Sequence, residues 1–321
     1  MRIDEEAIRV AAARGYDALP VTVYREFTDC LGIVFYRHYL AWFERGRENV
    51  ISVQFLADLF RETGESFVVT RSEQVFKRSA RYGDQLEVRT IPFLDGDYRL
   101  GFDQSVWHGN EMLVHGFVEM VCVSKSFQLA QQPALVRKLI GCFDECTRNF
   151  TYVGTKARMP QTIRRRRGTA SLPQAQKPLV FDGLHLHQAD TDFTGITFHP
   201  NYYCYFERAR SQALTPAVLA NVAEFANAVP VIRQARMTFK QGARAYETLR
   251  VLTSIALDDS GGSSSSSNKY VVPFEQVLVR REDDKVLVEA RIEIVFVDQT
   301  TKLPCPIPDA VAAKMQELFA V

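Results

Sequence analysis

The amino-acid sequence predicts an α+β protein of two tandem units, each with a long central helix wrapped by a curled antiparallel sheet. One observation is an internal repeat, because DCLGIVFYRHYLAWFERGR at residues 29–47 returns as DFTGITFHPNYYCYFERAR at residues 192–210. Nine of the 19 positions are identical at an offset of 163 residues, 192 minus 29, where chance gives roughly one. The other is the run of strand-like segments after the repeated stretch, since one helix followed by several strands is typical of α+β architecture.

The predicted strands follow the same repeat. Phe76-Lys77 returns as Phe239-Lys240 at the offset of 163 residues, and the match holds over about sixty residues. It breaks at residues 258–268, where DDSGGSSSSSN predicts a flexible hairpin extension or a mobile loop. In the first half the four predicted strands lie near residues 66–79, 84–93, 97–107 and 112–125.

The last strand of each half has one buried face. Apolar residues alternate with charged ones from Val288 to Phe296, and the run from Val114 to Cys122 has the same period in the first half. The repeated stretch instead has helical spacing, which places Tyr39, Phe43 and Gly46 on one face of a helix of about four turns from near Tyr36. A small residue on that face lets the helix approach a packed surface closely.

The length of 321 residues fits about two domains. We expect a first domain at 1–150, a linker at 151–180 and a second domain at 181–321. The first domain would add an N-terminal helix over 4–14, a strand over 21–28 and a C-terminal helix over 131–150. The arginine run 164–167 lies in the linker, where it is either a solvated segment or a docking patch for an acidic partner.

Composition excludes several classes of protein. The net charge of +1 argues against a nucleic-acid partner. The six cysteines lack zinc-finger spacing and favour a reduced cytoplasmic chain with no metal and no cofactor. No apolar run approaches the ~20 residues of a membrane helix, and the acidic N-terminus is unlike a signal peptide.

The repeated stretch also carries the candidate chemistry. Asp29 and Asp192 precede the glycine turns at Gly32 and Gly195, and each turn leads into a helix. A carboxylate beside a helix N-terminus can activate water or attack a carbonyl, and the unpaired N–H groups there can stabilise an oxyanion. The alternative is that each aspartate is only an N-cap.

The motif D-x-x-G-[IV]-x-[FY]-[YH]-x-x-Y-x-x-[YW]-F-E-x-x-R resembles the hotdog-fold acyl-CoA thioesterases. The first copy is similar to 4-hydroxybenzoyl-CoA thioesterase over residues 29–36. The second is similar to the Tol-Pal-associated thioesterases over 190–202, in the strand at 286–297 and in the closing segment 304–308. The resemblance implies a double hotdog, in which the two units form an internal pseudo-dimer with active sites between them; chains could also pair as homodimers.

The resemblance implies roles for particular residues. Asp29 and Asp192 would act as nucleophile or general base, and Tyr36 and His199 would stand at the helix starts beside the thioester. His199 could equally be a neutral polar residue there. Phe35 and Phe198, with Phe193, would line the acyl pocket or belong to the core. The cations that would contact phosphates of CoA or phosphopantetheine, or else lie on a solvated edge, are Lys77, Arg81, Lys240 and Arg244.

Other polar residues of the repeat have simpler readings. Glu44/Arg47 and Glu207/Arg210 are spaced as structural ion pairs on a helix. His38 is expected on the helix surface, and His185 and His187 are expected to be strand residues rather than metal ligands.

The function implied is hydrolysis of an acyl-CoA or acyl-carrier-protein thioester. A hotdog hydratase or dehydratase is an alternative. That chemistry usually needs an Asp–His pair, which the second half alone offers, as Asp192 with His199. A duplicated, non-catalytic acyl-binding module is another, but two matched carboxylates disfavour it.

Overall fold

The structure is a computed structural model that describes residues 5–147, 178–214, 216–255 and 269–319. The chain divides into two compact units, Met1–Thr169 and Ala170–Val321. The arginine run 164–167 and the serine-rich segment 258–268 lie outside the described residues.

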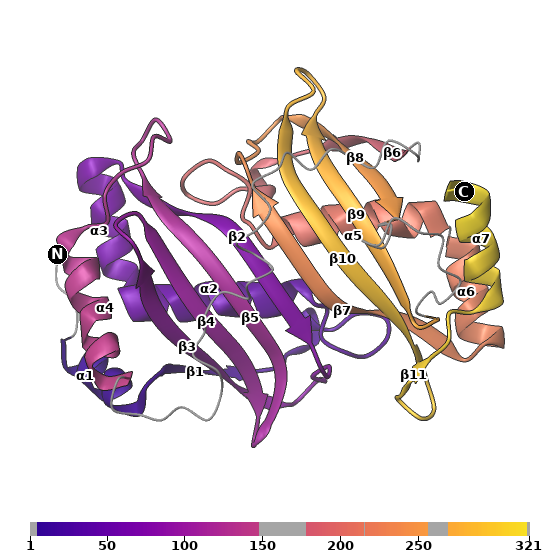
Figure 1. Cartoon of the computed structure of the whole chain (residues 1–321), viewed down its shortest axis with the longest axis horizontal. Helices are drawn as coiled ribbons and strands as arrows, with labels where there is room; N and C mark the ends of the chain where they lie inside the picture. The colour runs from indigo at the N-terminus through magenta and orange to yellow at the C-terminus, as the bar shows by residue number, and fades with distance from the viewer. Residues whose placement is uncertain (1–4, 148–177, 215, 256–268, 320–321) are drawn as a thin grey trace. The chain divides into compact units, whose positions relative to one another are not determined.

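The first unit is a five-stranded antiparallel sheet with a long helix, α2, along one face (Figure 1). The strand order is β1-β3-β4-β5-β2. Helix α4 packs against β3 and against α1. The elements in chain order are α1 (Glu5–Arg14), β1 (Asp17–Thr22), a 3-10 turn (Arg25–Phe27), α2 (Arg37–Ile51), α3 (Val53–Thr63), β2 (Ser66–Phe76), β3 (Gln85–Asp95), β4 (Arg99–His108), β5 (Glu111–Val123) and α4 (Ala134–Thr147).

The second unit repeats this plan. Its strand order is β7-β10-β9-β8-β6, with the short β11 pairing β10, and α5 is its long helix (Figure 1). The α+β class is confirmed in both units. The elements are β6 (Leu179–His185), a 3-10 turn (Gln188–Asp190), α5 (Asn201–Leu214), α6 (Pro216–Phe225), β7 (Ala228–Phe239), β8 (Thr248–Ile255), β9 (Val271–Arg280), β10 (Val286–Asp298), β11 (Pro304–Cys305) and α7 (Asp309–Phe319).

The long helices are buried on the face that the sequence predicted. Tyr39, Phe43 and Gly46 are all buried, and so are the corresponding Tyr202, Phe206 and Ala209. A Cβ atom added to Gly46 would lie 2.6 Å from Thr90 Oγ1, so only glycine allows α2 to approach β3 this closely. The alternating burial predicted for the last strands is also present in β5 and β10.

Some expectations are wrong. The strand expected at 21–28 ends at Thr22, and residues 25–27 form a 3-10 turn. The chain leaves the sheet after Val23, whose N–H donates to Asp84 O at 2.9 Å, and Phe27 is buried against the ring of Trp42. The helices α3, α6 and α7 were not predicted. Ser52, with φ of +84°, ends α2 and caps α3. The helical segment that begins at Arg37 is therefore divided into two helices.

A buried hydrogen-bond network joins α2 to the sheet. Arg47, which is 1% exposed, pairs with Glu44 and donates from Nη1 to Gln104 Oε1 at 2.7 Å. The Gln104 amide donates to the carbonyl oxygen of Phe43 at 2.8 Å and to Thr90 Oγ1 at 3.0 Å. Arg47 is therefore a structural residue, as expected, but its partners include Gln104 of β4 as well as Glu44 of its own helix.

The second unit contains the same network. Arg210 donates to Gln276 Oε1 at 2.5 Å, and the Gln276 amide donates to Phe206 O at 3.1 Å and Thr253 Oγ1 at 3.0 Å. A buried guanidinium is tolerated only where hydrogen bonds replace water. Each glutamine thus accepts a hydrogen bond from a buried guanidinium and donates one to a helix carbonyl.

Removal of the glutamine should destabilise the first unit. We expect Gln104→Leu to lower its free energy of unfolding by about 3 kcal/mol, because Arg47 and Phe43 O would lose buried partners. Both tryptophans of the chain, Trp42 and Trp107, lie in this unit, so their fluorescence during urea denaturation measures it. The exposed Gln131 provides the control, since Gln131→Leu should change stability by less than about 0.5 kcal/mol. Equal effects would contradict the role of the network.

Candidate active site

Each candidate aspartate sits in a closed turn. Asp29 N–H donates to Ile33 O at 2.9 Å, and Gly32 N–H returns to Asp29 O at 3.0 Å. The side chain accepts from Leu31 N–H at 2.8 Å. Gly32 has φ of +70°, a conformation in which a side chain would be strained. The turn therefore requires the glycine that the sequence repeats.

The second turn has the same backbone and a stronger hold on its carboxylate. Asp192 N–H donates to Ile196 O and Gly195 N–H to Asp192 O, both at 3.0 Å, and Gly195 has φ of +82°. Asp192 Oδ1 accepts from both the N–H and the hydroxyl of Thr194, at 2.8 and 2.5 Å. Leu31, the first-unit counterpart of Thr194, supplies only its N–H.

The N-cap alternative is excluded for both aspartates. The residue at the N-cap position of α2 is Tyr36, whose side chain makes no capping bond. Helix α5 begins at Asn201, nine residues after Asp192 (201 minus 192). Each carboxylate instead bonds within its own turn.

A buried tyrosine ties each turn to its helix. Ala80 N–H donates to the hydroxyl of Tyr39 at 2.8 Å, and Ala80 O accepts from Val34 N–H at 2.9 Å. In the second unit Ala243 N–H donates to the hydroxyl of Tyr202 at 2.9 Å, and Ala243 O accepts from Thr197 N–H at 2.7 Å. Burial raises the pKa of both tyrosines, that of Tyr202 to about 12, so both remain protonated. The only sequence signal for this bridge was the identity of the tyrosines across the repeat.

Tyr36 and His199 occupy matching places. The ring of Tyr36 meets Phe76 edge-on at 6.3 Å, and the ring of His199 meets Phe239 edge-on at 6.2 Å. His199 is 8% exposed. Phe35 and Phe198 are partly buried beside them, with ring centroids 4.6 and 5.8 Å away. Phe193 is 63% exposed and is not a core residue.

Two of the four repeated cations lie on segments that pair with the turns, and the other two directly follow β2 and β7. Arg81 and Arg244 are exposed, and their main chains pair with Ile33 and Ile196 of the turns through isolated antiparallel β-bridges. Lys77 is exposed at the end of β2. Lys240, its counterpart, donates to Glu289 at 2.5 Å.

Three further histidines, His38, His185 and His187, lie outside the two turns. His38 is half-buried between the rings of Phe27 and Phe35, at 5.2 and 6.3 Å, so its placement on the helix surface was wrong. His185 lies on β6 within 3.0 Å of Thr248 Oγ1, whereas His187 follows β6 and precedes a 3-10 turn. Among the described residues, no group of three or more His, Cys, Asp or Glu is arranged to hold a metal.

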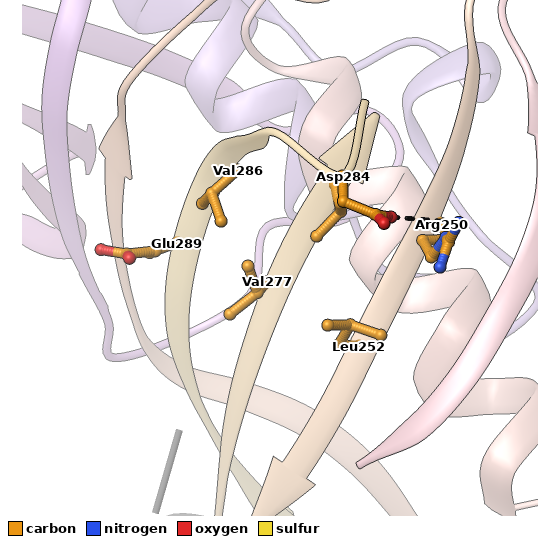
Figure 2. A pocket seen from close by; sticks show the side chains of 7 residues that line it. Arg250, Leu252, Val277, Asp284, Val286 and Glu289 are labelled. Carbon is orange, nitrogen blue, oxygen red and sulfur yellow. Dashed lines mark ion pairs between the residues drawn. The ribbon is translucent and has the colours of Figure 1, made fainter. Parts of the chain in front are cut away.

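The second unit has a cavity of about 350 Å³ apart from the turn (Figure 2). Its lining includes the apolar Leu252, Val277 and Val279 and also Arg250, which pairs with Asp284 at 3.2 Å. These strand residues alternate with Val251 and Leu278, so the cavity lies on the opposite face of the sheet from those two side chains. None of its lining residues belongs to the turn of Asp192.

Comparisons with known proteins show what the sequence is similar to. Residues 186–315 match the model of the thioesterase-like superfamily. The chain is 26% identical over 135 residues to the acyl-CoA thioester hydrolase YbgC of Escherichia coli O6:H1, an alignment that covers 42% of this chain and 93% of that protein.

Solved structures match a larger part of the chain. The 12:0-ACP thioesterase from Umbellularia californica aligns with a TM-score of 0.66 and 16% identity over 91% of this chain and 95% of that one. An acyl-ACP thioesterase from Bacteroides thetaiotaomicron aligns with a TM-score of 0.61 and 10% identity, over 89% and 99%. At these identities the likeness establishes the fold.

These matches confirm the resemblance to the hotdog thioesterases and the α+β hotdog fold. The relatives themselves are named as acyl-CoA and acyl-ACP thioesterases. Within the described residues, no helix is both long and apolar enough to cross a membrane.

The half-buried His38 should make stability depend on pH. Burial, together with Arg37 and Arg45, lowers its pKa from 6.5 to about 4. Between these pH values the unfolded chain binds a proton that the folded chain does not, so stability falls as pH drops from about 6.5 to about 4. We expect His38→Asn, which installs the residue found at the matching position 201, to remove this part of the loss. Urea denaturation at several pH values measures it; an unchanged pH dependence would contradict the assignment.

Proposed function

We propose that this chain hydrolyses an acyl thioester of CoA or of an acyl carrier protein, giving the free acid and the thiol. The observation that carries the proposal is the matched pair of turns. Each holds a carboxylate in a glycine-dependent loop next to the start of a buried helix. Thioester hydrolysis requires these two elements, a group that activates or delivers the nucleophile and donors for the oxyanion.

The carboxylates of Asp29 and Asp192 have two possible roles, as general base or as nucleophile. As a general base, the carboxylate takes a proton from water while the water oxygen bonds the acyl carbon; the C–S bond then breaks and the thiolate receives the proton. As a nucleophile, it forms an acyl-aspartyl anhydride as the thiolate leaves, and water then hydrolyses the anhydride. The N–H groups at the helix starts, near Tyr36 and His199, would stabilise the oxyanion in either case.

The two sites are proposed to be unequal. His199 can exchange hydrogen bonds with a bound thioester, whereas Tyr36 offers an aromatic face and a distant hydroxyl. The acyl group would extend along Phe35 or Phe198. Thr194 adds a second hydrogen bond to the carboxylate of Asp192, so we infer that the second turn is the better organised.

The cations beside the turns are proposed to bind the phosphates of the thioester carrier. Lys77, Arg81, Lys240 and Arg244 are exposed, and phosphate recognition by such side chains is favourable. Two further cations of the first unit, Arg25 and Arg78, correspond to the uncharged Gln188 and Gln241 at the offset of 163 residues.

The tandem units are proposed to be a double hotdog in which the two halves form an internal pseudo-dimer. Support comes from the solved acyl-ACP thioesterases, whose alignments extend over about nine-tenths of this chain. Two other functions remain as alternatives to hydrolysis. One is hydration or dehydration of an acyl thioester, and the other is acyl binding without turnover.

Loss of the carboxylates should abolish turnover. We expect Asp192→Asn to lower kcat at least about a hundredfold, the usual contribution of a general base, and Asp29→Asn to have a smaller or equal effect. The assay measures free thiol from a panel of acyl-CoAs and acyl carrier proteins. Asp298 supplies the control, since it also accepts turn N–H groups, from Thr300 and Thr301, and Asp298→Asn should leave kcat unchanged. Full activity in the Asp29→Asn/Asp192→Asn double variant would refute the assignment.

Reversal of the basic edge should weaken binding rather than chemistry. We expect Lys77→Glu with Arg81→Glu to raise KM about tenfold at low salt with little change in kcat, because uniform binding is lost, and the effect should shrink as salt rises. Arg99→Glu with Lys125→Glu makes the same charge change at the other end of β5. Equal KM values for the two double variants would exclude carrier binding at this edge.

A further inference from the structure

The two turns are fastened to their helices by different chemistry. Three positions in contact with one another differ together between the halves at the offset of 163 residues. In the first unit all three side chains are aromatic rings, and in the second all three are hydrogen-bonding groups. The pairs are Phe27 and Asp190, His38 and Asn201, and Trp42 and Tyr205.

Asp190 is the centre of the second-unit set. Its Oδ1 accepts from the hydroxyl of Tyr205 at 2.9 Å, and its Oδ2 accepts from His187 N–H at 2.9 Å. Its main-chain oxygen accepts from Asn201 Nδ2 and from Phe198 N–H, each at 2.9 Å. One residue therefore joins the entry of the turn, its exit and two successive turns of α5.

The first-unit set has packing in place of these bonds. The ring of Phe27 meets Trp42 edge-on at 5.3 Å and His38 at 5.2 Å. Of the four bonds that Asp190 accepts, the described part of the first unit keeps the one from Phe35 N–H to Phe27 O, at 2.9 Å. The indole nitrogen of Trp42 is buried and has no hydrogen-bond partner in the described part of the chain. Edge-on ring contacts tolerate sliding, whereas hydrogen bonds fix distance and direction.

The bonds of Asp190 brace the two groups proposed to react. Asp190 stands two residues before Asp192, and Asn201 stands two residues after His199. The bond between them therefore sets the separation of the carboxylate from the helix start. Tyr205 adds a second point of attachment one turn further along. Burial and Asp190 raise the pKa of Tyr205 far above its usual value, so its hydroxyl remains a donor.

We propose that Asp190, Asn201 and Tyr205 are positioning residues that hold Asp192 at a fixed distance from the start of α5, and that they make the second site the faster of the two. The inference rests on the proposed thioesterase function. A misplacement of about 1 Å can cost on the order of a hundredfold in rate. The aromatic set of the first unit would hold Asp29 less firmly and leave that site slower.

The test transplants the first-unit set into the second unit of the full-length chain. Asp190→Phe, Asn201→His and Tyr205→Trp are combined, a set that already packs on the same backbone in the first unit. We expect kcat to fall at least about tenfold with KM within about twofold and the melting temperature nearly unchanged. Tyr205→Phe, which removes only one hydroxyl, is the milder variant if the transplant does not fold, and it should lower kcat in the same way.

Conservative rescue separates positioning from general structural support. Asp190→Asn retains an oxygen that can accept from Tyr205, so it should keep more kcat than Asp190→Ala at equal melting temperature. The control is Tyr98→Phe, which removes the hydroxyl of an exposed side chain outside both sets and should leave kcat unchanged.

The outcomes distinguish the two proposals. No thiol release by the wild-type chain from any substrate would defeat the proposed function. Wild-type kcat in both the transplant and Tyr205→Phe, with an active parent, would overturn the positioning role alone. Loss of kcat only in proportion to loss of folded protein would also overturn it.

Discussion

The close packing of each central helix on its sheet is the constraint on which the rest of the structure depends. Gly46 leaves no room for a side chain between α2 and Thr90, and the glutamine networks satisfy the buried arginines that lie in this interface. Because the helix is fixed to the strands, its N-terminus has a fixed position. The turn that precedes the helix inherits that position.

The path from core to site is short and made of named bonds. Tyr39 and Tyr202 project from the helices to bind Ala80 N–H and Ala243 N–H. The carbonyl groups of the same alanines hold Val34 and Thr197 of the turns. A tyrosine hydroxyl in the core is thus one residue away from the loop that carries a candidate catalytic carboxylate. Stability and positioning share these contacts, so melting temperature and kinetics must be measured together.

Duplication has preserved the backbone of the site and altered its supports. Both turns keep the glycine with positive φ and the same pair of backbone hydrogen bonds. Around them, Leu31 differs from Thr194, and the ring of Phe27 differs from the carboxylate of Asp190. A repeated fold can therefore carry two sites of different quality without any change in architecture.

Short-range periodicity and the constant offset were enough to predict the α+β class, the repeat, the buried helix face and the glycine turns. The residues that support the site could be identified only in the folded chain. Gln104 and Gln276 escaped notice because they are 172 residues apart (276 minus 104) rather than 163, and Asp190 and Phe27 share no chemistry for a repeat to reveal. The 3-10 turn at Arg25–Phe27 was hidden for a related reason. Its sequence alternates like a strand, and it leaves the sheet because Phe27 is buried against Trp42, a contact that exists only once the chain has folded.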